Sequence, residues 1–142
     1  MRKLIGLLLT LVACGGSPAG PTEIPDAIRD QLHAATGHEP DSCGDLRTGA
    51  AVIEITPEGF SPECAIVSIE QSIVVRNIQD TDDTWIVADP ENNLVPRHVR
   101  ILREIPAGGE VEVPLIRDIA PSGVWPCYGR ESRHQCQLVI VP

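Results

Sequence analysis

A series of short apolar segments, which fills residues 50–142, constrains the fold of this chain more than any other feature. Apolar and polar residues alternate within most of the segments, which is the period of a β-strand with one buried face. Thirteen prolines and twelve glycines interrupt the chain often and disfavour long helices. Seven or eight such strands predict an all-β fold, either a Greek-key β-sandwich or a barrel. The segments are AAVIEI (50–55), CAIVSI (64–69), SIVVRN (72–77), TWIVAD (84–89), RHVRILREI (97–105), EVEVPLI (110–116), GVWPCY (123–128) and QLVIVP (137–142).

One short helix is expected ahead of the strands, within IPDAIRDQLHAATGHEP (24–40). Asp26 is expected to cap its start and Gly37 to end it. Four apolar residues recur at helical spacing and should pack against the domain: Ile24, Ile28, Leu32 and Ala35.

The first thirteen residues have the features of an export signal. Arg2 and Lys3 precede an apolar run from Leu4 to Ala13 that is too short to span a bilayer as a stable helix. The run ends in LVAC (11–14), which resembles the lipobox of bacterial lipoproteins. That resemblance implies a diacylglyceryl thioether, with fatty chains of the palmitate type, on Cys14. The alternative is an ordinary secretory signal with an incidental cysteine.

Three regions follow from this reading of the chain. Residues 1–13 are the signal peptide, 14–24 are the lipidated cysteine with a flexible Gly-Ser-Pro tether, and 25–142 are one domain with an N-terminal helical extension. Gly15, rather than an aspartate, follows the cysteine, which favours the outer membrane of a Gram-negative cell. We therefore expect a protein of the cell envelope that is held to the membrane by its lipid.

The charge of the chain argues against nucleic acid as a partner. Residues 1–13 contain two basic residues and no acids, so their removal changes the net charge from −9 to −11. RHVR (97–100) and RESRH (130–134) are small basic islands, which we expect to balance nearby acids rather than to form a binding patch.

Four cysteines remain once Cys14 is assigned to lipid. An even number in an exported domain predicts two disulfide bonds, and four cysteines allow three pairings. The four are Cys43, Cys64, Cys127 and Cys136.

The strands resemble those of the cupredoxin family, the plastocyanin-like blue-copper proteins, over about residues 50–142. Phe60 and Pro62 stand where that family has a Phe-x-Pro motif, and SIVVRN ends in the family's asparagine, Asn77. Glu70-Gln71 stands at the intervening turn without the usual glycine. EIPAGGEVEVPL (104–115) resembles the Pro-x-Gly turn before a strand, and SGVWPCYGRESRHQCQLVIVP (122–142) resembles the closing hairpin. The resemblance implies a cupredoxin-like Greek-key β-sandwich.

The copper site of that family is degenerate in this sequence. Blue copper requires two imidazoles, a thiolate and usually a thioether. Thr84 stands nearest the place of the first histidine, and Cys127 stands at the place of the thiolate. His134 follows Cys127 by seven residues, too late for the usual second histidine, and Cys136 stands near the axial position. We therefore expect a disulfide between Cys127 and Cys136 in place of copper, which leaves Cys43 to pair with Cys64. Cross-pairing between the two sets stays open.

Other side chains of the sequence also carry groups that bind metal ions. A zinc or copper site that uses His98, Cys127, His134 and Cys136 is the alternative to the disulfide. His33 and His38 are expected to be exposed and not ligands. DTDDT (80–84) has the carboxylates for calcium but lacks a known calcium loop pattern, so a solvated turn is expected.

No catalytic motif stands out in the sequence, so we expect no enzyme. The expected function is a membrane-anchored lipoprotein whose metal-free, disulfide-stabilised cupredoxin-like domain has a structural or binding role toward an unidentified protein or small molecule. The alternative is an envelope protein that binds copper or transfers electrons.

Overall fold

The computed structural model describes residues 23–89, 99–114 and 116–142. The predicted signal peptide, Cys14 and His98 lie outside these residues. No helix in the described ranges has the length and apolar character needed to cross a bilayer. The elements are α1 (Asp26–Thr36), η1 (Pro40–Ser42), β1 (Gly44–Asp45), β2 (Ala51–Thr56), β3 (Gly59–Ser61), β4 (Cys64–Ser68), β5 (Ile73–Asn77), β6 (Asp83–Ala88), β7 (Val99–Ile105), β8 (Glu110–Val113), η2 (Ile116–Asp118), β9 (Gly123–Gly129) and β10 (Gln135–Val141).

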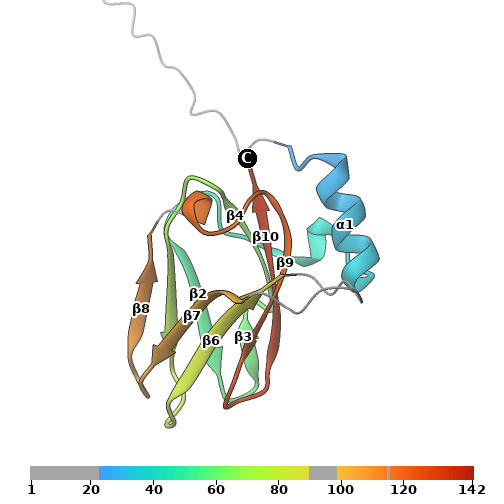
Figure 1. Ribbon diagram of the computed structural model, residues 1–142. Coiled ribbons are helices and arrows are strands. Elements are labelled where there is room, and N and C mark those ends of the chain that lie inside the picture. The colour runs from blue at the N-terminus through green and yellow to red at the C-terminus, as the bar shows by residue number, and fades with distance from the viewer. Residues whose placement is uncertain (1–22, 90–98, 115) are drawn as a thin grey trace, which may run out of the picture.

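The described strands form two sheets packed face to face, with the helix α1 beside them (Figure 1). One sheet has the order β1-β4-β10-β9-β6-β7 and the other has the order β3-β2-β5-β8. β4 and β10 run parallel, and so do β2 and β5, while β9 and β10 form an antiparallel hairpin. The predicted all-β sandwich is confirmed. The sequence did not predict β1 and β3, which are only two and three residues long.

The space between the sheets is filled by aliphatic side chains and a few aromatic ones. Alternation within the strands places Ile53 and Ile55 of β2, together with Ile73 and Val75 of β5, in this core. Val99 was expected to share a buried face with Ile101, yet it is 49% exposed. The pairing of β6 with β7 shifts register between Val87 and Ala88, and this bulge turns Val99 outward.

A second, smaller core lies between α1 and the outer face of the larger sheet. Ile28 and Leu32 of the helix pack there on Cys64, Ile66, Val124, Val139 and Val141. Ala35 is exposed, so its predicted place on the packed stripe was wrong. The helix ends as predicted at Gly37, whose φ of 71° is left-handed.

The predicted cap at the start of α1 was also wrong. Pro25 is the N-cap residue, and no side chain caps the helix there. Asp26 is the first helical residue instead, where its charge is favourable beside the positive end of the helix dipole.

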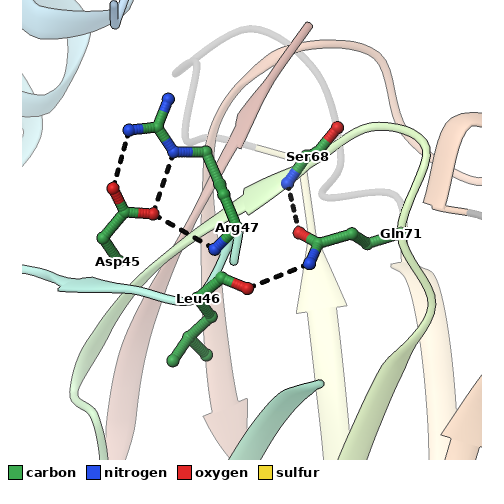
Figure 2. Close-up of polar contacts among 5 residues, drawn as sticks. All are labelled: Asp45, Leu46, Arg47, Ser68 and Gln71. Atoms are coloured by element: carbon green, nitrogen blue, oxygen red, sulfur yellow. Dashed lines mark hydrogen bonds and ion pairs between the residues drawn. The ribbon is translucent and has the colours of Figure 1, made fainter. Parts of the chain in front are cut away.

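Polar side chains fasten the connection after β1 to the turn between β4 and β5 (Figure 2). The side-chain oxygen of Gln71 accepts a 2.7 Å hydrogen bond from the Ser68 amide, and its amide nitrogen donates to the carbonyl of Leu46 at 2.9 Å. The guanidinium group of Arg47 donates two hydrogen bonds to the carboxylate of Asp45, from Nε at 2.9 Å and from Nη2 at 2.6 Å. The hydrogen bonds from Arg47 hold the pKa of Asp45 below its ordinary value. We call these residues, Asp45, Arg47 and Gln71, the closed cluster. The resemblance implies a glycine at this turn, and the sequence has none. The side chain of Gln71 holds the turn by these hydrogen bonds instead.

Candidate functional site at the Cys127–Cys136 hairpin

The β9–β10 hairpin carries the residue that stands at the place of the copper thiolate. Cys127 and Cys136 are direct partners across the two strands, with 4.8 Å between their Cα atoms, and their sulfur atoms are bonded. Both residues are almost fully buried in the core between the sheets, at 2% and 3% exposure. Cys43 and Cys64 form the other disulfide, which lies in the smaller core under α1. All four cysteines of the described chain are therefore oxidised and paired.

Thr84, at the start of β6, stands nearest the place of the first copper histidine. Its amide donates a 2.6 Å hydrogen bond to Oε2 of Glu131, and its hydroxyl lies 3.2 Å from Oε1 of the same carboxylate. Glu131 belongs to the loop that joins β9 to β10. Thr84 thus ties the hairpin loop to β6 by hydrogen bonds.

Asp83 lies beside Thr84 and is only 2% exposed. Its Oδ1 accepts hydrogen bonds from the amides of Thr84 at 2.8 Å and Glu131 at 3.0 Å. Burial by itself would raise the pKa of Asp83, but the hydrogen bond from the Ser132 hydroxyl and those from the loop outweigh it, so the pKa lies below its ordinary value. The expectation of a solvated turn over residues 80–84 was therefore wrong for Asp83 and Thr84, which are buried at the start of β6. We call Asp83, Thr84, Glu131 and Ser132 the loop cluster.

Gly129 is required where the loop cluster meets the hairpin. A Cβ at this position would run into the hydroxyl of Ser132 and the carboxylate of Asp83. The glycine leaves room for the buried carboxylate to reach the loop amides.

The histidines do not converge on the hairpin cysteines. Nε2 of His134 lies 3.1 Å from the carbonyl oxygen of Pro57, in the turn between β2 and β3. His33 lies 3.0 Å from Glu39 on the exposed side of α1, and His38 is exposed, as expected. No group of three or more histidine, cysteine, aspartate or glutamate side chains in the described ranges is arranged to hold a metal ion.

The donor set of this hairpin does not fit copper. A blue-copper centre needs a thiolate and two imidazoles. Here the sulfur of Cys127 is in a disulfide, the hydroxyl of Thr84 bonds to a carboxylate, and the ring of His134 bonds to a backbone carbonyl. Each group that would have to bind the ion already has another partner.

A groove of about 350 Å³ runs along the outer face of the hairpin. Cross-strand pairing sets Gln135 beside Tyr128 and Gln137 beside Pro126. Arg130 and Arg133, from the loop, complete the lining. Neither arginine side chain has a hydrogen-bond or ion-pair partner among the described residues, so the acids expected to balance RESRH form no direct pair with it there. Arg100, in the other basic island, does pair with Asp89, at 2.6 Å.

Comparisons with solved structures agree with this topology. A mutant of amicyanin in its Cu(I) form superposes with a TM-score of 0.50 and 8% identity over 68% of this chain and 86% of that one. The copper-containing nitrite reductase of Thermus scotoductus superposes with a TM-score of 0.50 and 8% identity, over 68% of this chain and 23% of the enzyme. The fold is cupredoxin-like. No protein-family model and no curated protein sequence matches the chain.

Proposed function

We propose that this chain is a lipid-anchored protein of the cell envelope whose cupredoxin-like domain is a metal-free binding module. The observation that carries the proposal is the bond between Cys127 and Cys136. The cysteine that would supply a copper thiolate has no thiolate while that bond exists, and electron transfer through blue copper depends on the thiolate.

The hairpin also has other means to hold its loop in place. In a copper protein the metal joins the loop to the neighbouring strand through its ligands. In this chain the disulfide closes the base of the loop, and Glu131 joins the loop to Thr84 of β6. An ordered loop therefore needs no ion, which supports a role in binding rather than in redox chemistry.

The side chains around the hairpin also favour a binding role over an enzymatic one. Nucleophilic catalysis needs a hydroxyl or thiol within reach of a base. The ring nitrogens of His134 and His33 contact a backbone carbonyl and an exposed glutamate respectively, and neither contact activates a nucleophile.

The position of the hairpin suits a protein that is tethered at Cys14. Ile24 packs with Val141, so the described chain begins at the end of the sandwich where β10 finishes (Figure 1). The loop of the hairpin lies at the other end of β10. A lipid on Cys14, joined to the domain through the segment that ends at the packed Ile24, would therefore leave the hairpin at the end of the sandwich away from the membrane.

Peptide mapping of the mature, non-reduced protein tests the disulfide half of this proposal. We expect no free thiol, and peptides that join Cys127 to Cys136 and Cys43 to Cys64. Free thiols on both Cys127 and Cys136 in protein isolated from the envelope would restore the copper-binding alternative.

Replacement of Cys14 tests the anchoring half. Cys14→Ser is expected to block processing or to release the domain from the membrane fraction, because serine has no thiol for the thioether. Processing and membrane fractionation equal to those of the wild type would show that the lipobox assignment is wrong. The mature disulfides should be the same in both proteins, which serves as the folding control.

A further inference from the structure

We propose that the outer groove of the β9–β10 hairpin binds a small sugar acid, through a carboxylate held by Arg130 and Arg133. This inference rests on the proposed binding role and names the ligand class. The groove, at about 350 Å³, lies in the range of small-ligand sites. It lies beyond the C-terminal end of α1, where the helix no longer covers the sheet, since Thr36 and His38 line the adjoining hollow together with Gln135 and Gln137.

The two groove arginines differ from every other arginine that the structure describes. Arg47, Arg76, Arg100 and Arg117 bind carboxylates, and the guanidinium groups of Arg29 and Arg103 donate to backbone carbonyls. The guanidinium groups of Arg130 and Arg133 donate to no described residue. In a chain of net charge −9, two neighbouring arginines without an acid partner among the described residues form a local site for an anion.

The backbone at Arg133 strengthens the case for a function of its side chain. Arg133 is the one described residue other than glycine with a left-handed backbone, at φ = 61°. Glycine adopts this conformation without the steric cost that an arginine bears. A position that geometry alone would assign to glycine therefore carries a guanidinium group at the rim of a groove.

The remaining lining groups indicate what accompanies the carboxylate. Tyr128 and Pro126 occupy one face of β9 and present a ring surface on which a sugar can stack. Gln135 and Gln137 occupy the same face of β10, and each amide both donates and accepts hydrogen bonds, as hydroxyl groups require. None of these side chains makes a hydrogen bond within the described chain. An aromatic ring, two amides and two guanidinium groups together match a hydroxylated ring that carries a carboxylate.

Calorimetric titration of the mature protein in detergent tests the assignment, with galacturonate disaccharide as the probe. The neutral galactose disaccharide is its matched control, and we expect it to bind at least tenfold more weakly because it has no carboxylate. We expect Arg130→Gln and Arg133→Gly each to weaken binding of the acid at least fivefold. Arg117→Gln should leave the affinity unchanged, since that exposed arginine pairs with Glu70 at the other end of the molecule.

Three results would overturn the proposal. They are equal binding of the acidic and the neutral disaccharide, unchanged affinity in the Arg130→Gln and Arg133→Gly proteins, and displacement of the acid by an equal concentration of inorganic phosphate, which would indicate a site for any anion. Glycine suits the backbone at residue 133, so loss of binding in Arg133→Gly is not expected to come from misfolding. A melting temperature no lower than that of the wild type checks this. A failure of this proposal does not affect the metal-free proposal, because that one is tested separately by peptide mapping of the thiols and by copper titration.

Discussion

The two ends of the sandwich use arginine and glutamine in opposite ways. In the closed cluster, where the described chain begins, Arg47 is bonded to Asp45, and the Gln71 amide is bonded to two backbone segments (Figure 2). Along the hairpin at the other end, the side chains of Arg133 and Gln135 have no hydrogen-bond or ion-pair partner among the described residues. The same residue types therefore hold the backbone at one end and are free to meet a ligand at the other.

The backbone of the hairpin is held in place, although the side chains that line its outer groove have no partners among the described residues. The disulfide fixes the base of its loop, and the loop cluster fixes the middle, so the free side chains stand on a rigid support. A site built in this way loses little conformational entropy when a ligand binds. The comparison predicts that substitutions at the closed cluster change stability and that substitutions along the groove change binding.

The largest expected effect comes from the disulfide Cys43–Cys64 in the smaller core under α1. A Cys43→Ala, Cys64→Ala double variant should lose about 3 kcal/mol of unfolding free energy, because a 21-residue separation is no longer constrained in the unfolded chain. Urea titration measures the loss, and binding at the hairpin should survive wherever the variant is folded. A loss below about 1 kcal/mol would show that the stability of the domain does not depend on this cross-link.

The next effect concerns the buried carboxylate that supports the hairpin loop. Asp83→Asn should cost about 2 kcal/mol at neutral pH, since the charged acceptor of several hydrogen bonds is removed. The folded pKa of Asp83 is lowered, so its stabilisation is complete above the unfolded pKa of about 4 and is lost as the pH falls through the folded pKa. Urea titrations should therefore show a large difference in unfolding free energy between the wild type and Asp83→Asn at pH 7, and a smaller one at pH 2. An equal difference at both pH values would contradict the low pKa.

A matched pair of glutamines tests the comparison directly. Gln71→Ala should cost about 1–2 kcal/mol, because it leaves the Ser68 amide and the Leu46 carbonyl without their partner. Gln135→Ala should change stability by less than about 0.5 kcal/mol, as expected for an exposed side chain without a partner. Thermal melts of both variants give the two values. Equal losses would remove the distinction between the closed and open ends.

The smallest effect has the opposite sign. Arg133→Gly should stabilise the protein by about 0.5 kcal/mol. It removes the steric cost of an arginine in the left-handed conformation, and the greater entropy of glycine in the unfolded chain offsets part of that gain. Arg47→Ala, its counterpart in the closed cluster, should destabilise, since it breaks the bidentate pair with Asp45. A clear destabilisation by Arg133→Gly would mean that this side chain has a structural role.

Patterns of local spacing predicted most of the fold. Alternation and short apolar runs predicted seven or eight strands, eight of the described strands match those segments, and Gly37 ends the helix as predicted. Local patterns failed where an element is too short to show a period, or where the structure depends on residues far away in the sequence. The two-residue β1 has no periodicity to detect, and the bulge that exposes Val99 depends on how β6 pairs with β7.

The hairpin site was only half visible in the sequence. The cysteines that flank the loop indicated a disulfide, and the loss of the expected histidine indicated a degenerate site. The partnership of Asp83 with Glu131 was missed because the two residues are 48 positions apart, and an aspartate in an acidic run has the pattern of a solvated turn. Whether Arg130 and Arg133 have a carboxylate partner depends on where the acidic side chains lie in the folded domain, and no local sequence pattern predicts that.

The most direct test of the central claim is a copper titration of the untreated mature protein. After loading with excess Cu(II) and desalting, we expect no intense blue absorption, because Cys127 has no thiolate and neither Thr84 nor His134 is free to bind the ion. Reduction would free two thiols that bind Cu(I) without colour, but it would not supply the missing histidine. A stoichiometric blue band in the untreated protein would contradict the account.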